Sequence, residues 1–212
     1  PIVQLARSHD CQIIGDIDLL CRSQGDARFI GITGTNGKST TTTLMGHILG
    51  ECGMATEAGG NLGTPALDLA PLDEQGTYVL ELSSYQLDLC PAVIMDVAVL
   101  LNITPDHLDR HGGMDGYVAA KRQVFQNQSA GQVAVVGVDD AYTSKIFDDL
   151  KAHGAQQVVA ISGARTVPGG VYVMDGDLVD DLQNKAATVL KMAEALALTG
   201  EHNHQNAAAA YA

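Results

Sequence analysis

Short apolar runs recur along the chain, and most are followed by a segment that favours a helix. Apolar runs bounded by turn residues are typical of buried strands, and strands alternating with helices predict a largely parallel sheet covered on both faces. We therefore predict an α/β fold built on a P-loop-type, mostly parallel sheet. The strands are expected at 28–32, 54–58, 77–82, 97–102, 132–137 and 157–161, and the helices at 38–50, 64–69, 83–89, 114–127 and 141–152.

The regions that flank this alternation have a different pattern. Residues 165–190 contain "VYVMDGDLVDD", which predicts a small β-hairpin turning at Asp175-Gly176, because Asp-Gly suits the tight turns that join antiparallel strands. The first residues predict a helix at 2–9, a strand at 11–14 and a helix at 16–23.

The two ends of the sequence are unlike those of a complete protein. The chain opens on Pro1 with no methionine, in what reads as the middle of a strand–helix unit. It closes on "GEHNHQNAAAAYA", whose alanine-rich tail predicts the start of a helix with nothing after it. We expect the sequence to be a fragment of a longer protein.

Composition excludes several classes of partner. The 212 residues include 12 basic and 25 acidic side chains, and this gives a net charge of −13. Such a charge disfavours binding to nucleic acid or to anionic membranes. Tryptophan is absent and aromatic residues make up 4% of the chain, which argues against base-stacking surfaces.

Cysteine usage and hydropathy indicate the compartment. The four cysteines (Cys11, Cys21, Cys52 and Cys90) form no C-x-x-C pair, and we expect them to be small core residues in a reducing compartment. The sequence shows neither a signal peptide nor an apolar run long enough to span a bilayer. The expectation is a soluble, cytoplasmic protein.

The segment "FIGITGTNGKST", residues 29–40, predicts a phosphate-binding loop between a strand and a helix. Gly34 and Gly37 allow backbone angles that turn successive N–H groups toward an anion, and the N-terminus of the following helix adds unpaired N–H groups. Lys38 supplies a cation for the β- and γ-phosphates, and the Ser39 hydroxyl can bind Mg²⁺. Five residues separate Gly31 from Gly37, where the general P-loop pattern has four.

Ligands of parallel sheets gather at the carboxyl ends of the strands, so polar residues at those ends are candidate site residues. Glu81 ends the strand "YVLEL" and could hold Mg²⁺, although a glutamate that caps the next helix is equally consistent with the sequence. His107 follows the strand "VAVLLNIT" in a loop. Asn61 lies in the turn "GGNLG", where it is either a recognition group or a left-handed turn residue.

Other polar residues give weaker signals. Taken alone, Lys121 in "YVAAKRQVF" reads as a solvated helix lysine. His202 and His204 have the spacing of a possible metal pair, but residues two apart on a helix face different directions, so we do not expect them to be ligands.

Several motifs together resemble the Mur ligase family of ATP-dependent amide-forming enzymes. Within that family, "ELSSYQL" and "DHLDRHG" resemble the members that join D-glutamate to UDP-N-acetylmuramoyl-L-alanine in peptidoglycan precursor synthesis. The resemblance divides the chain into the end of a uridine-nucleotide-binding domain (1–24), a central ATP-binding domain (25–199) and the start of a C-terminal domain (200–212). The fragment alone is then expected to be inactive. The motifs, in chain order, are "GTNGKST", "GGNLG", "ELSSYQL", "NITPDHLDRHG", "AAKRQVF" and "GEHNHQN".

The resemblance also implies roles for individual residues. The expected catalytic residues are Lys38, His107 and Lys121. Two Mg²⁺ ions are implied, one held by Ser39 and Glu81 and the other by His107 and Lys121. Because an ammonium group has no lone pair for a metal, Lys121 would carry a carbamate. The implied ATP-binding residues are Gly34, Thr35, Asn36, Gly37, Lys38, Ser39, Thr40 and Asn203, and the implied substrate-binding residues are Gly60, Asn61, Ser83 and His107. The implied partners are the two small-molecule substrates, and the protein is expected to be a monomer.

Three alternatives share the phosphate loop. A GTPase-type switch would need a guanine-reading N-K-x-D motif, whereas the Asn-Lys pair here, Asn184-Lys185, is followed by two alanines. A nucleotide-binding module without catalysis would not need His107 and Lys121. A folylpolyglutamate synthase shares "GTNGKS" but does not carry E-L-S-S-x-Q-L.

Overall fold

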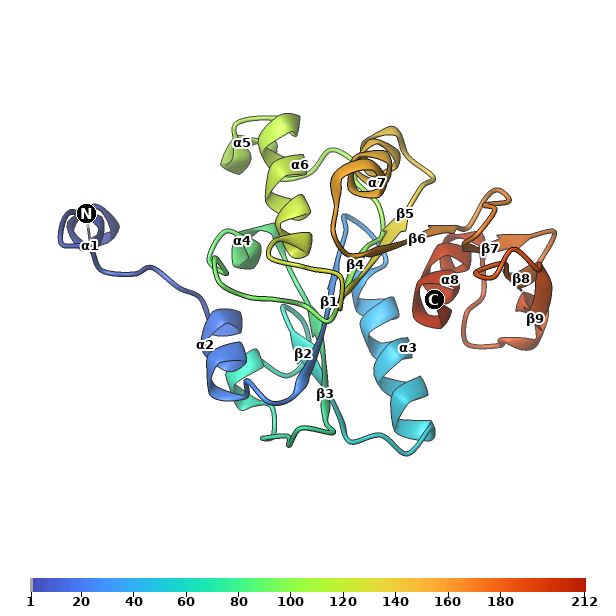
Figure 1. Cartoon of the computed structure of the whole chain (residues 1–212), viewed down its shortest axis with the longest axis horizontal. Helices are drawn as coiled ribbons and strands as arrows, with labels where there is room; N and C mark the ends of the chain where they lie inside the picture. The colour runs from blue at the N-terminus through green and yellow to red at the C-terminus, as the bar shows by residue number, and fades with distance from the viewer. Residues whose placement is uncertain (1) are drawn as a thin grey trace.

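The computed structural model describes residues 2–212 and contains one nine-stranded sheet of order β2-β3-β1-β4-β5-β6-β7-β8-β9 (Figure 1). Every neighbouring pair from β2 to β7 is parallel, and the last two pairs are antiparallel. The sheet confirms the predicted α/β class. The strands are β1 (Arg28–Thr33), β2 (Thr56–Gly60), β3 (Thr77–Glu81), β4 (Val97–Leu100), β5 (Val133–Gly137), β6 (Gln157–Ser162), β7 (Val171–Met174), β8 (Asp177–Asp180) and β9 (Ala187–Lys191).

Helices cover both faces of the sheet, because successive strand side chains point to opposite faces and most are apolar. On β3, Val79 packs into one core, whereas Tyr78 and Leu80 pack into the other. One face carries α2 (Asp16–Ser23), α4 (Ser84–Leu87), α6 (Met114–Arg122) and α7 (Ala141–His153), and the other carries α3 (Lys38–Glu51) and α8 (His204–Tyr211). Two short helices complete the set, α1 (Ile2–Ser8) and α5 (Leu108–His111).

The predicted hairpin is present as β7 and β8, with Met174 paired to Asp177. Asp175 (φ 52°) and Gly176 (φ 82°) are both left-handed, which matches the right-handed twist of the strands they join. The strand β9, which the sequence did not indicate, pairs with β8 and extends the antiparallel part of the sheet.

Some predicted elements are wrong. Residues 11–14 form no strand, and no strand pairs with them to supply a hydrogen-bond ladder. The helix expected at 64–69 is only a 3₁₀ turn, Ala66–Asp68. The Thr64 carbonyl accepts from the Gly60 N–H group, and Leu69 has an extended backbone, so neither residue is helical. The helix expected at 114–127 ends at Arg122 and tightens into a 3₁₀ turn.

The cysteines are not all core residues. Cys90 is buried and Cys21 is half-buried, as expected for small apolar side chains, but Cys11 and Cys52 are exposed. Cys11 lies in the segment after α1, a helix that buries none of its residues. In the part of the chain from residue 2 onward, no helix is long and apolar enough to cross a membrane.

Candidate functional site

The loop between β1 and α3 has the geometry expected of a phosphate cradle. Gly34 (φ 154°) and Gly37 (φ 84°) take angles that other residues resist. Gly37 begins α3 without a side-chain cap, so the first N–H groups of that helix are left for another acceptor. A Cβ atom at Gly37 would also collide with the Asn206 amide. Both the backbone angle and the available space therefore require glycine at this position.

Ser39, Glu81 and Asn61 meet at the carboxyl edge of the sheet. The Ser39 hydroxyl donates to Glu81 Oε2 at 2.7 Å, and Asn61 Nδ2 donates to Glu81 Oε1 at 3.0 Å. Glu81 is 3% exposed. These side chains come from the start of α3, the end of β3 and the turn after β2. A cavity of about 110 Å³ adjoins Ser39 and Glu81. Lys38 Nζ meanwhile donates to the Thr35 carbonyl at 3.0 Å, within the phosphate loop.

The structure decides two alternatives that the sequence left open. Glu81 does not cap α4, because Ser83 does so in a capping box with Gln86. Asn61 is not in a left-handed conformation, and the positive φ angles of that turn belong to Gly60 and Gly63. Both Glu81 and Asn61 thus direct their side chains to the cluster around Ser39.

Lys121 is buried, and the reading of it as a solvated helix lysine is wrong. The residue is 2% exposed. Its Nζ donates to the Gly34 carbonyl at 2.7 Å and to Thr33 Oγ1 at 3.4 Å, and it lies 4.9 Å from the centre of the Tyr117 ring. The helix α6 therefore places an amine directly beneath the phosphate loop.

The surroundings of Lys121 shift its ionisation. Burial, which disfavours the charged form, is the largest cause, and repulsion from Lys38 adds to it. Together they lower the pKa of Lys121 to about 7, against the opposing attraction of Asp106 and Glu81. A lowered pKa leaves part of the amines neutral near neutral pH. A neutral amine has the lone pair that an ammonium lacks.

His107 occupies a more open position than Lys121. It begins α5 in a left-handed conformation (φ 50°), and its Nε2 lies 3.4 Å from Asp106 Oδ2. A row of rings links His107 to Lys121. The ring centroids of neighbouring members lie 5.3 to 5.7 Å apart, in the order His107, Tyr85, His111 and Tyr117. His107 and Lys121 thus lie at two ends of one aromatic cluster, and no direct bond between them is among the contacts of residues 2–212.

Three amide side chains that the sequence did not single out support the loop. Asn102 bonds both backbone groups of Asn36, and Gln205 bonds Asn102. Asn206 accepts from Thr41 Oγ1 at 3.2 Å. Asn203 donates to the Thr199 carbonyl and accepts from Asn206. It thereby fixes the position of Asn206, the residue that lies against Gly37 of the loop. Asn102 follows the carboxyl end of β4, and the strand-end rule that selected Glu81 could have selected it.

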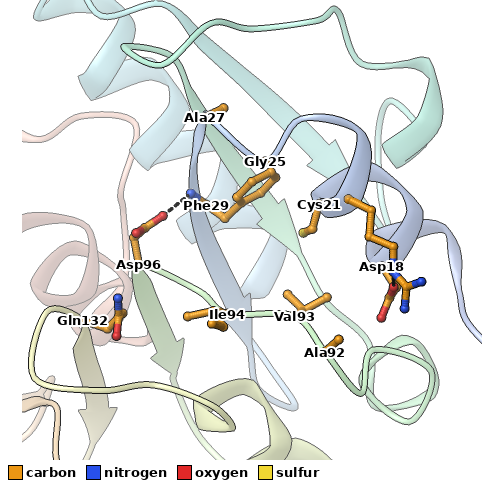
Figure 2. A pocket seen from close by; sticks show the side chains of 11 residues that line it. Asp18, Cys21, Gly25, Ala27, Phe29, Ala92, Val93, Ile94, Asp96 and Gln132 are labelled. Carbon is orange, nitrogen blue, oxygen red and sulfur yellow. Dashed lines mark hydrogen bonds and ion pairs between the residues drawn. The ribbon is translucent and has the colours of Figure 1, made fainter.

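A second cavity, of about 360 Å³, opens at the other edge of the sheet (Figure 2). Figure 2 shows it among the N-terminal ends of β1, β4 and β5 and the helix α2, with Asp96 accepting from the Phe29 N–H group at 2.8 Å. None of the predicted site residues lines it. The polar groups expected to carry chemistry all lie at the carboxyl edge.

The donor set at that edge fits nucleotide and Mg²⁺. A hydroxyl and a buried carboxylate 2.7 Å apart offer the oxygen ligands that Mg²⁺ prefers beside a phosphate loop. The Lys121 amine itself offers no oxygen ligand to Mg²⁺. No cluster of three histidine, cysteine, aspartate or glutamate side chains suited to a metal occurs among residues 2–212.

A parallel strand followed by a glycine-rich loop and by a helix that begins with a lysine and a serine defines a phosphate-loop protein. Residues 32–212 match the model of the Mur ligase middle domain, and the chain belongs to the Mur ligase family. It is 54% identical to the UDP-N-acetylmuramoylalanine–D-glutamate ligase of Rhodospirillum rubrum, over all of this chain and 44% of the relative. For the corresponding ligase of Caulobacter vibrioides the identity is 46%, over 99% of this chain and 46% of the relative. The chain thus spans less than half the length of these relatives.

Solved structures have the same fold. A UDP-N-acetylmuramoyl-L-alanyl-D-glutamate–2,6-diaminopimelate ligase superposes with a TM-score of 0.65 at 23% identity, over 87% of this chain and 42% of that one. The MurF ligase from Thermotoga maritima in complex with ADP superposes with a TM-score of 0.56 at 19% identity, over 92% of this chain and 48% of that one. At these identities the likeness concerns the fold alone.

Proposed function

We propose that this chain is the ATP-binding part of a ligase that joins D-glutamate to UDP-N-acetylmuramoyl-L-alanine in peptidoglycan precursor synthesis. The relatives at 54% and 46% identity carry the name of that activity. The observation that carries the proposal is the meeting of the phosphate loop, the Ser39–Glu81 pair and the buried Lys121 at one edge of the sheet.

In the proposed reaction the substrate carboxylate attacks the γ-phosphorus of ATP, and ADP leaves. The amine of D-glutamate then attacks the resulting acyl phosphate, loses a proton and expels phosphate as the amide bond forms. The first step brings an anion onto an anion, and the second builds negative charge on the oxygen of the tetrahedral intermediate, so positioned cations lower both barriers. Lys38 would move from the Thr35 carbonyl to the transferring phosphoryl group. Ser39 and Glu81 would hold one Mg²⁺, which would neutralise phosphate charge when bound.

The remaining proposed contacts follow the loop and its neighbours. His107 would serve both the substrate and the second Mg²⁺. The phosphate loop and the first turn of α3, residues 34–40, with Asn203 on the adenine side, would bind ATP, and Gly60, Asn61 and Ser83 would bind the muramoyl substrate. Asn61 supports this because it bonds Glu81, and Ser83 supports it because it caps α4 two residues after Glu81.

Lys121 is proposed to carry a carbamate. Its neutral amine would attack the carbon of CO₂, form the N–C bond and release one proton, which leaves a carboxylate at the end of the side chain. A pKa of about 7 supports this chemistry, since a fully protonated lysine could not react. The carboxylate would share the second Mg²⁺ with His107.

The domain division is part of the same proposal, with boundaries after residues 24 and 199. A monomer is part of the proposal. A cytoplasmic location follows from the requirement for ATP. The non-catalytic alternative is opposed by the burial of Lys121, because a module that only binds nucleotide has no need for a buried amine there.

The test has two stages. The 212-residue chain should bind ADP–Mg²⁺ in calorimetry, and Lys38→Ala should abolish binding while Lys151→Ala, at an exposed lysine, should not. The natural protein that contains these residues should release phosphate only when UDP-N-acetylmuramoyl-L-alanine and D-glutamate are both present. Turnover with a different amino acid or with a folate would favour another ligase of the same class, and unchanged binding by the Lys38 variant would refute the phosphate loop.

The carbamate has its own test in that natural protein. Lys121→Ala should lower turnover by orders of magnitude, and added acetate should partly restore it by occupying the position of the carbamate. Lys38→Ala should not respond to acetate, because it lacks a cation. Near-normal turnover of the Lys121 variant would contradict the proposed role.

A further inference from the structure

One side chain, that of Asn102, binds both backbone polar groups of a residue in the phosphate loop. Asn102 Oδ1 accepts from the Asn36 N–H group at 2.9 Å, and Asn102 Nδ2 donates to the Asn36 carbonyl at 3.1 Å. Both backbone hydrogen-bonding groups of Asn36 are therefore committed to Asn102. The N–H groups of the following residues, Gly37 and Lys38, are left to face an anion.

Asn102 is held in turn by Gln205, in the first turn of α8. Asn102 Nδ2 donates to Gln205 Oε1 at 3.0 Å, and Gln205 Nε2 donates to Asp139 Oδ2 at 2.9 Å. Asp139 is anchored at the ends of β5 and β6, where Ser162 Oγ donates to its Oδ1 at 2.5 Å and the Gly163 N–H group to its Oδ2 at 2.8 Å. A continuous chain of hydrogen bonds thus joins the far strands to the loop.

The direction of every bond in this chain follows from Asp139. An ionised carboxylate only accepts hydrogen bonds, so the amide nitrogen of Gln205 must face Asp139 and its oxygen must face Asn102. The nitrogen of Asn102 must then face Gln205, and its oxygen is directed at the Asn36 N–H group. A side chain that merely filled the space would impose no such order on the loop.

Two glycines lie against Gln205. A Cβ atom at Gly163 would lie 2.7 Å from the Gln205 backbone nitrogen, whereas one at Gly137 would collide first with the Leu101 carbonyl and would also lie 2.7 Å from Gln205 Nε2. Neither glycine has a φ angle in the left-handed region, so space and not backbone freedom accounts for them. The ends of β5 and β6 thus leave space for Gln205 as well as for the Leu101 carbonyl.

We propose that Gln205 is a positioning residue for the phosphate loop. Its hydrogen bond to Asp139 fixes the orientation of its amide, and this in turn fixes the orientation of the Asn102 amide that binds Asn36. The loop is therefore ordered before nucleotide binds. The inference rests on the proposed function, because it is ATP that would benefit from a preordered loop. Gln205 itself touches neither the loop backbone nor, in this account, the nucleotide.

The experiment compares three variants of the 212-residue chain. Gln205→Leu removes both polar atoms. Gln205→Glu keeps the size of the side chain but places a carboxylate against Asp139. This variant tests the same hydrogen bond if Gln205→Leu does not fold. Gln128→Leu is the matched control, because Gln128 Nε2 also makes two hydrogen bonds, to the Met95 and Val133 carbonyls, at the opposite edge of the sheet.

The first measurement is hydrogen exchange at the Asn36 amide without nucleotide. It should be on the order of 10-fold faster in both Gln205 variants and unchanged in the Gln128 variant. The second is the affinity for ADP–Mg²⁺, which should fall about 10-fold, or about 1.4 kcal/mol, in the Gln205 variants alone.

The outcomes separate the two ideas. Unchanged Asn36 exchange in the Gln205 variants would overturn the positioning role, and so would an equal acceleration in the Gln128 control. If the unsubstituted chain bound no ADP, the proposed nucleotide site would fail, while the exchange measurement would still decide whether Gln205 orders the loop.

Discussion

Replacing Lys121 with methionine tests the origin of its shifted ionisation. The side chain is 2% exposed, and burial together with Lys38 lowers its pKa from 10.5 to about 7. In the unfolded chain the amine recovers its ordinary pKa, so between these two values the unfolded state binds more protons than the folded state. The free energy of unfolding therefore rises with pH across this window. This added stability is lost as the pH falls through about 7, the pKa of the folded state.

The magnitude follows from the two pKa values. One pKa unit corresponds to about 1.4 kcal/mol, so the full difference is on the order of 5 kcal/mol between high pH and pH values below 7. Between pH 7 and 8.5 the stability of the unsubstituted chain should rise by about 1.6 kcal/mol from this group. The window stops at 8.5 because Cys21 and Cys90, whose pKa values burial raises to about 12, contribute with the opposite sign above their unfolded value of 9.0.

The assay is urea unfolding at four pH values from 7 to 8.5 in buffers freed of CO₂, so that the amine stays unmodified. Lys121→Met should be more stable than the unsubstituted chain at pH 7 and should lose the upward slope. Lys151→Met, at an exposed lysine near Phe147, should keep the slope. An equal slope in the unsubstituted chain and in Lys121→Met would refute the reasoning.

Three further outcomes are expected. Lys38→Ala should remove ADP–Mg²⁺ binding in calorimetry with an unchanged circular dichroism spectrum; retained affinity would contradict the phosphate-loop role. Gly37→Ala should weaken both stability and nucleotide binding, since φ is 84° and the new Cβ meets Asn206; a variant with the thermal midpoint of the unsubstituted chain would count against this geometry. Asp140→Ala should cost about 2 kcal/mol in urea unfolding, because this carboxylate caps α7 and also accepts from the Ile103 N–H group; a loss below about 0.5 kcal/mol would contradict that.

The parallel part of the sheet could be predicted because its strands are continuous apolar runs. β3 is buried along its whole length, and such a strand is legible without knowledge of its neighbours. Residues 11–14 have a similar short apolar pattern, but a strand also needs a partner, and none lies beside them. The strand β9 was missed for the converse reason, because it forms by pairing with β8 while most of its residues remain exposed.

The candidate site could be predicted from the sequence where it depends on the spacing of glycines or on residues at strand ends. The phosphate loop and Glu81 follow from such patterns. The burial of Lys121 does not, because a helical lysine looks solvated until the end of β1 and the loop at Gly34 are known to lie over it. Asn102 and Gln205 bond each other across 103 positions, and no local pattern records such a contact. The family motifs pointed to Lys121, and only the fold gives the physical reason.

The position of β1 also affects how the chain folds. This strand precedes the other eight in the sequence, yet it lies between β3 and β4, with Ile30 opposite both Val79 and Val97. It can be fully paired only after residue 100 has been added, whereas the strands from β4 to β8 each pair with the next strand in the sequence. Non-local pairing of this kind is slow because a long loop must close first. During synthesis the apolar strand that leads into the phosphate loop therefore stays unpaired longest, and that interval is when the nascent chain is most exposed to aggregation.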